Sequence, residues 1–74
     1  MLKMNDKILV NYYGEVRKGF VRKVRTWQGS NFYGEDVYYL TLDEPVNVGT
    51  ILESTNVFIE PLLINSGKIK ISKI

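Results

Sequence analysis

Neither cysteine nor histidine occurs among the 74 residues of this chain. Without cysteine, disulfides and thiolate metal sites cannot be built. Without cysteine and histidine together, the usual nucleophile–base pairs and zinc ligand sets are also excluded. The paired acids at residues 35–36 and 43–44 lie in turn-like contexts, where solvation is their ordinary role. We therefore expect a protein that is not an enzyme, with no catalytic site, no metal and no cofactor.

Long apolar runs are also missing. No run approaches the roughly 18 residues that would span a bilayer, and residues 1–6 lack the apolar segment of a signal peptide. Hydrophobic residues nevertheless make up 45% of the chain and aromatics 12%, which suffices for a compact core. We expect one domain over residues 1–74, near the smallest size that an apolar core alone can hold together. The expected location is cytoplasmic, with no membrane partner.

Basic side chains are absent from residues 26–67, a stretch that holds six carboxylates. Residues 1–25 carry seven basic and two acidic side chains, and residues 68–74 add three lysines, which makes the formal net charge +2. Five of the bases fall within nine residues, at Arg17, Lys18, Arg22, Lys23 and Arg25. The near-neutral total thus hides a bipolar chain, and the cluster predicts one ribbon that faces an anion.

Proline is scarce as well, and short turn signals rich in Gly, Asn, Asp and Ser divide the chain into runs of Val, Ile, Tyr and Phe. No segment shows the apolar stripe of a helix, with its period of about 3.6 residues. We expect strands at residues 7–13, 15–27, 36–42, 50–53 and 56–59, with Pro45 and Pro61 ending the third and the last. A C-terminal hairpin of residues 62–64 and 68–71 should follow. The fold class predicted from this pattern is all-β.

Alternation within the strands assigns side chains to faces. In the first strand, Ile8, Val10 and Tyr12 share one face, and Leu9, Asn11 and Tyr13 share the other. In the third, Tyr38, Leu40 and Leu42 are expected inward, and Val37, Tyr39 and Thr41 outward. In the second, the apolar parity changes near Gly19, which suits a bulge or tight bend. Strict alternation would put Arg17, Lys23 and Arg25 on one face and Lys18 and Arg22 on the other, unless a bulge at Gly19 realigns them.

Four segments carry a resemblance to a known scaffold. Residues 6–10 (DKILV), 19–24 (GFVRKV), 39–43 (YLTLD) and 57–62 (VFIEPL) resemble, in order and spacing, the strand motifs D-x-V-x-V, G-x-V-x-x-V, Y-x-V-x-L-D and V-x-x-x-P-L of KOW and Tudor-type barrels. The resemblance implies an SH3-like barrel of five or six strands over residues 6–62, with a strand or hairpin extension over residues 62–74. Barrels of this kind bind RNA, DNA, proteins or modified side chains, so the resemblance implies a scaffold and leaves the ligand open.

The residues expected to bind a ligand are the bases of the second strand and the aromatics around them: Arg17, Lys18, Arg22, Lys23, Arg25, Tyr12, Tyr13, Trp27, Phe32 and Tyr33. The bases would contact phosphates and the aromatics would stack on nucleobases. Two alternatives stay open. The bases can instead be a solvated strand that discourages edge-to-edge pairing, or pair with acids on neighbouring strands. Phe32 or Tyr33 can instead fold back to cap one end of the barrel.

The function expected from these residues is binding of an anionic ligand, either nucleic acid or a nucleotide. The alternative from another class is a protein-binding inhibitor or adaptor of the kind that phages encode to modulate host proteins, possibly in defence, which the small size and the lack of catalytic residues favour. Such a protein would work in the bacterial host cell. An aromatic cage of the Tudor type would draw on the same aromatics together with Tyr38 and Tyr39.

Two further expectations concern assembly. Residues 68–71 alternate lysine and isoleucine, and their isoleucine face can either cover the barrel or complete a sheet in a second chain. Because an extension beyond a finished barrel is a common route to dimers, we expect a homo-oligomer. Type II dihydrofolate reductases, which are oligomeric, share the scaffold and carry a V-Q-I-Y-P stretch in their last strand. The corresponding residues 57–61 read V-F-I-E-P here, with Phe58 and Glu60 in place of the amide and the phenol. That enzyme is therefore a remote alternative.

Overall fold

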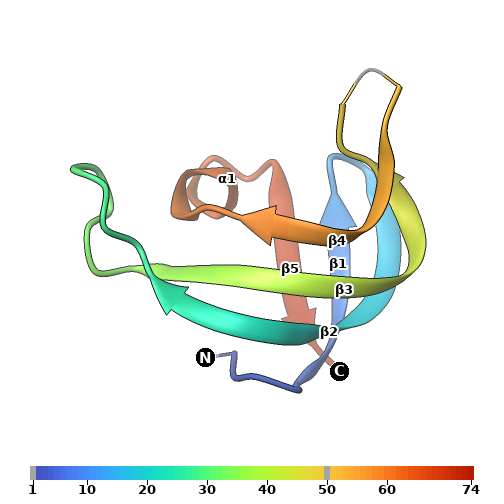
Figure 1. The fold of residues 1–74 in the computed structure, drawn as a ribbon, viewed down its shortest axis with the longest axis horizontal. Helices are drawn as coiled ribbons and strands as arrows, with labels where there is room; N and C mark the ends of the chain where they lie inside the picture. The colour runs from blue at the N-terminus through green and yellow to red at the C-terminus, as the bar shows by residue number, and fades with distance from the viewer. Residues whose placement is uncertain (1, 50) are drawn as a thin grey trace.

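The computed structural model describes residues 2–49 and 51–74. In these residues five antiparallel strands form one sheet in the order β4-β3-β2-β1-β5 (Figure 1). The elements are β1 (Lys7–Tyr12), β2 (Glu15–Thr26), β3 (Asp36–Asn47), β4 (Glu53–Ile59), α1 (Pro61–Asn65) and β5 (Ile69–Lys73). The predicted all-β class is confirmed. Within the described ranges, no helix is long and apolar enough to cross a membrane.

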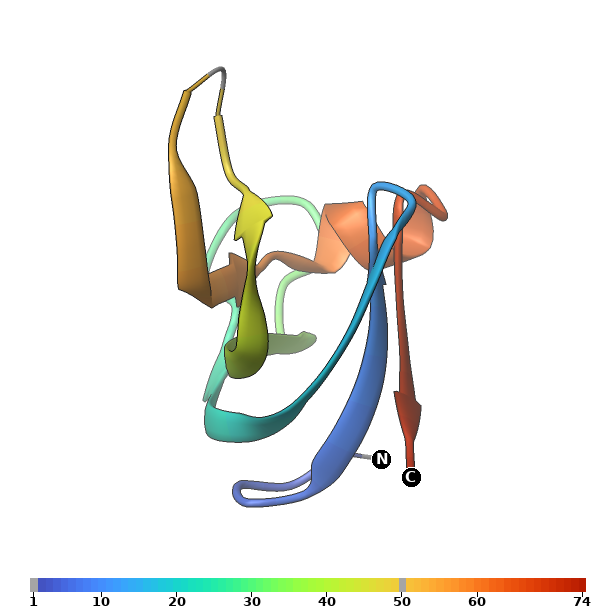
Figure 2. The same ribbon diagram turned by 90° about the vertical axis from the view of Figure 1, so that its right-hand side faces the viewer.

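The sheet curls around its core in the manner of a small barrel without closing (Figure 2). β4 and β5 are its two edge strands, and they are not hydrogen-bonded to each other. α1 lies between the end of β4 and the start of β5, and it contacts β5. Leu63 and Ile64 of this helix pack against the core. The helix therefore covers the gap that strand pairing leaves open.

The core is built from the inner face of the strands, as the alternation predicted. Its buried side chains are Ile8, Val10, Tyr12, Val21, Leu40, Leu42, Val46, Val57, Ile59 and Ile69. The opposite parity of β1 is exposed, as at Leu9 and Tyr13. In β3, Leu40 and Leu42 are buried and Tyr38 packs against them, which confirms the expected inward face. Period-two alternation thus assigned these strands correctly.

Gly19 is not at a bulge, which corrects one expectation. It pairs regularly with Ile8 of β1 and Leu42 of β3. The irregularity of β2 lies between Val21 and Lys23, where Arg22 is the extra residue. Gly19 is needed for another reason, because a Cβ there would overlap the carbonyl oxygen of Thr41 and come 2.9 Å from the Leu42 Cα. Glycine at this position lets β3 approach β2 closely.

The variant Gly19→Ala is expected to lower the free energy of unfolding by about 1–3 kcal/mol or more. The atoms that the new methyl would meet belong to the backbone of β3, so the strands themselves must move apart. Urea unfolding followed by circular dichroism would measure the loss. Gly49→Ala is the matched control, since its Cβ would meet only Leu52, at 4.0 Å. Equal stability of the two variants would contradict the close approach of β2 and β3.

The remaining strands differ from their expected limits. The two short strands expected at 50–53 and 56–59 are one strand, β4, and residues 54–56, expected as a turn, lie inside it. Residue 50 lies outside the described residues, and residues 51 and 52 precede the strand. β3 runs past its expected end through Pro45 to Asn47, and its pairing with β4 is irregular between Thr41 and Val46. Pro45 is tolerated there because an irregular stretch does not require its missing N–H.

The segment 62–64, expected as the first strand of a C-terminal hairpin, is part of α1 instead. Pro61 occupies the first turn of that helix, where its missing N–H breaks no helical hydrogen bond. The chain then turns through Gly67, whose φ of 80° lies in the left-handed region. β5 follows and pairs antiparallel with β1. The C-terminal extension is thus a helix and an edge strand of the same sheet.

Candidate functional site

The extra residue in β2 determines where its basic side chains point. Before it, Val21 faces the core opposite Leu40, and after it Lys23 pairs with Tyr39 of the outer face. Without an insertion, Lys23 would share the inward parity of Val21. The insertion reverses the alternation, so that Arg22, Lys23 and Arg25 are all exposed. The split between faces that strict alternation predicted is therefore wrong for these three bases.

Aromatic rings lie beside these bases on the outer side of β3 and β4. Tyr39 and Phe58 are cross-strand partners, and their rings stack with centroids 4.9 Å apart and an interplanar angle of 20°. The guanidinium carbon of Arg22 lies 5.7 Å from the centre of the Tyr39 ring, within the range of a cation–π contact. We call this surface the basic-aromatic face, and it comprises Arg22, Lys23, Arg25, Trp27, Tyr39 and Phe58.

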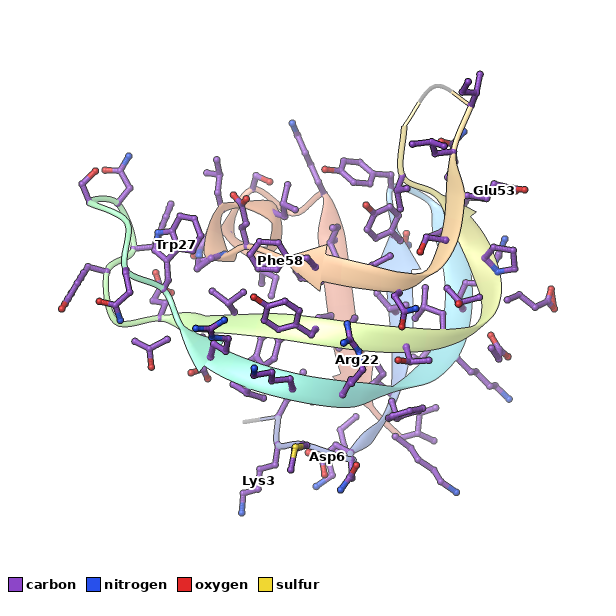
Figure 3. The ribbon with its side chains drawn as sticks, in the orientation of Figure 1. Lys3, Asp6, Arg22, Trp27, Glu53 and Phe58 are labelled. Atoms are coloured by element: carbon purple, nitrogen blue, oxygen red, sulfur yellow. The ribbon has the colours of Figure 1, made fainter. Side chains whose placement is uncertain are left out.

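The basic-aromatic face contains a hollow of about 250 Å³, lined by Arg25, Thr26, Trp27, Gln28, Gly29, Val37, Tyr39 and Phe58. One of its lining residues, Val37, is only 3% exposed and does not belong to the central core cluster. In Figure 3, Arg22 lies over β2 and β3 and Phe58 over β4, whereas Trp27 lies beyond the end of β2, near α1. A flat apolar ring would find apolar walls and a cation together here.

Trp27 is held in place by the loop that follows it. Its indole Nε1 donates a hydrogen bond to the carbonyl of Asn31 at 2.7 Å. Gly29 packs directly on the indole, because a Cβ there would come 2.5 Å from Nε1. The backbone of Trp27 is tied to the far end of the loop, with its N–H donating to the Glu35 carbonyl at 2.8 Å. The indole is therefore positioned before any ligand arrives.

A second hollow of about 250 Å³ lies next to the first and shares Trp27 and Gly29 with it. Its other lining residues are Ser30, Asn31, Phe32, Glu60 and Leu62. Within the described residues, the Glu60 carboxylate makes no hydrogen bond and no ion pair. We call this second depression the Glu60 hollow.

The ion pairs of the described chain lie away from the basic-aromatic face. Arg17 contacts the Glu15 carboxylate at 3.5 Å and donates to the Pro45 carbonyl at 3.2 Å. Lys73 lies 3.6 Å from the Asp6 carboxylate, whose pKa is lowered first by the backbone N–H of Lys3 and then by Lys73. Arg22, Lys23 and Arg25 form no ion pair with any residue in 2–49 or 51–74. Their charge is available to a ligand.

Other residues expected at the site lie elsewhere. Arg17 is turned aside toward Glu15, and Lys18 lies beside Leu9 and Asp43 on the outer side of β1 and β2. Tyr12 belongs to the core, and burial is the main cause that raises the pKa of its phenol. Tyr13 packs edge-on against Tyr12 at the β1–β2 turn, with centroids 5.0 Å apart. These four residues are at the opposite end of β2 from Trp27.

The two aromatic residues of the 28–35 loop lie in different surroundings. Phe32 is half-buried, lines the Glu60 hollow and has a left-handed φ of 61°. Tyr33 is 69% exposed and lines neither hollow. Phe32 therefore joins the site through Trp27, and Tyr33 points to solvent.

Phe58 and Glu60 were not among the expected site residues, and Tyr39 was named only for an aromatic cage. The outward parity of Tyr39 was visible in the sequence, but its partners were not. Phe58 lies opposite Tyr39 because of the register of β3 and β4. Lys23 lies opposite Tyr39 because of the bulge in β2. Alternation on one strand does not specify cross-strand neighbours, because they depend on register.

Among residues 2–49 and 51–74, no group of histidine, cysteine, aspartate or glutamate side chains is arranged to hold a metal ion. The candidate site is thus a cationic surface with two ring-lined hollows on either side of one tryptophan. No protein-family model matches this chain, and neither the curated proteins nor the solved structures include a match to it.

Proposed function

We propose that the basic-aromatic face binds a single strand of nucleic acid. The observation that carries this proposal is the insertion at Arg22, which sets three basic side chains of β2, unpaired among the described residues, beside the stacked pair Tyr39–Phe58. Cations along a backbone track and rings that accept bases are the two components of sequence-tolerant single-strand binding. A single strand fits better than a duplex, because its bases offer their flat faces to the protein.

The scaffold resemblance supports the same proposal. The strand motifs shared with KOW and Tudor-type barrels belong to a class of small barrels that includes nucleic-acid binders, and the curled five-stranded sheet is compatible with that class. We assign the chain to this SH3-like group as part of the proposal. A free nucleotide would use the same contacts, but it offers only one base, whereas the hollow of the basic-aromatic face has the Glu60 hollow beside it.

Salt dependence tests the proposal directly. Trp27 is the only tryptophan, so its fluorescence reports on the face itself. Titration with a mixed-sequence DNA 12-mer should change that fluorescence, and the logarithm of the association constant should fall with log salt at a slope of about −2 for three phosphate contacts to a single strand. The affinity would drop about 20-fold between 50 and 200 mM salt. Absence of binding at 50 mM salt, or binding that salt does not weaken, would contradict the proposal.

A protein partner is the second candidate, favoured by a different surface. Val48, Ile51 and Leu52, in the β3–β4 connection, are 41%, 89% and 63% exposed. Exposed apolar side chains gathered on one projecting segment are common at protein contacts. The inhibitor or adaptor function would be established by two results. The protein would bind no oligonucleotide but would capture a bacterial protein, and the variant Ile51→Ser/Leu52→Ser would no longer capture it. The expected homo-oligomer stays a prediction, and the edge position of β5 supports it.

A further inference from the structure

We propose that the Glu60 hollow takes one base of the bound strand and selects bases that carry an exocyclic amino group. This inference rests on the proposed function, because it concerns the same strand on the same surface. Trp27 and Gly29 line both hollows, so the two depressions are neighbours across one indole. A strand with one base against Tyr39 and Phe58 can place the adjoining base beside Phe32.

The size of the Glu60 hollow suits a single base. Its volume of about 250 Å³ is below the roughly 300–1,000 Å³ of pockets that enclose whole drug-sized ligands. Trp27, Phe32 and Leu62 supply apolar walls for a ring, whereas Ser30 and Asn31 supply polar groups at its rim. The sugar and phosphate would stay outside the hollow, toward the basic side chains of β2.

The polarity of the hollow specifies which edge of a base can enter. An ionised carboxylate only accepts hydrogen bonds, and the Glu60 carboxylate has no donor among the described residues. Cytosine, adenine and guanine each present an amino group that can donate to it. Thymine has no amino group, and the carbonyl oxygens on either side of its N3–H would face the carboxylate unfavourably.

A cationic side chain is a less suitable occupant than a base. The Glu60 hollow borders a surface on which Arg25 lines the adjoining depression and Arg22 and Lys23 are close by. Three cations that form no ion pair within 2–49 and 51–74 repel a cationic ligand and attract a phosphodiester chain. A neutral amino-bearing base satisfies the carboxylate without opposing that field.

Two pyrimidine octamers, dC8 and dT8, provide the sharpest test because they have rings of the same size but different hydrogen-bonding edges. We expect wild-type protein at pH 7.5 and 50 mM salt to bind dC8 about tenfold more tightly than dT8, as one charge-assisted hydrogen bond would give. In the variant Glu60→Gln this preference should disappear, since an amide both donates and accepts. Trp27 fluorescence would measure all the affinities.

The control variant is Glu53→Gln, which removes the same charge from an exposed position on β4 that lines neither hollow. It should keep the preference for dC8. Glu60→Gln should fold normally, because the Glu60 side chain makes no capping hydrogen bond to α1. Salt-sensitive binding of dC8 and dT8 with equal affinity would overturn this inference and leave the proposed function standing. A preference that survives in Glu60→Gln would also overturn it. Binding of neither octamer would remove the proposed function itself.

Discussion

Reversal of the three charges on the basic-aromatic face, in the variant Arg22→Glu/Lys23→Glu/Arg25→Glu, is expected to abolish oligonucleotide binding. With a salt slope of about −2, phosphate contacts contribute a factor of several hundred to the affinity at 50 mM salt relative to 1 M. The variant loses this contribution and adds repulsion, so its affinity should fall by more than about 100-fold. Fluorescence anisotropy of a labelled 12-mer would measure the loss. The fold should persist, because all three side chains are exposed and unpaired within the described residues.

A matched variant distinguishes the effect of the basic-aromatic face on affinity from the effect of the net charge. Lys7→Glu/Lys68→Glu/Lys70→Glu makes the same change in net charge at exposed positions on β1 and beside and within β5. Only long-range attraction is altered there, so its affinity should fall by less than about tenfold. Equal losses in the two variants would show that net charge and not the basic-aromatic face holds the strand. Unchanged binding by the first variant would exclude the face altogether.

The largest expected effect on stability comes from Leu40→Ala. Leu40 is fully buried at the centre of β3, where it pairs with Val21 of β2 and Val57 of β4. Removing a buried leucine side chain costs about 2–5 kcal/mol, through lost burial and the cavity left behind. A chain of this length has a total stability on the order of 4–11 kcal/mol. Urea unfolding should therefore show the free energy of unfolding roughly halved, with a matching drop in the midpoint.

Leu52→Ala is the control for the same chemical change at an exposed site. Leu52 is 63% exposed, so its truncation should change the free energy of unfolding by no more than about 0.5 kcal/mol. Similar destabilisation by both variants would mean that the inner face of β3 is not the core. The control also tests the second candidate function. If Leu52→Ala is stable but fails to capture a protein partner, the contact with that partner includes Leu52.

Individual β-strands were predictable where local alternation determines which face of the strand is buried. Ile8, Val10 and Tyr12 could be placed inward because each is two residues from the next, and burial of one face requires that period. The same holds for Leu40 and Leu42 in β3. Prediction from residue spacing failed where a strand departs from two-residue alternation. The bulge was expected at Gly19, the only glycine of β2, but Gly19 is there because Thr41 comes close to it.

The C-terminal region was mispredicted for a related reason. Leu62 to Ile64 form a short apolar run, and such a run is compatible with a strand or a buried helical turn. Pro61 at the first turn favours the helix, and the gap between β4 and β5 gives Leu63 and Ile64 an apolar surface to cover. That surface exists only when the sheet has curled. Of the expected site residues, Arg22, Lys23, Arg25 and Trp27 lie on one face and Phe32 lies beside it, whereas Phe58 and Glu60 were not expected and Tyr39 was named only for an aromatic cage.

By itself, the sequence determined the β class, the inward faces of the regular strands and the concentration of positive charge on the second strand. These follow from residue type and from spacings of one or two positions, which the chain carries locally. Only the tertiary structure decided that Arg22, Lys23 and Arg25 share a surface, that Phe58 stacks on Tyr39, and that Trp27 separates two hollows. Those relations depend on strand register and on one inserted residue, and register is set by the packing of the whole sheet.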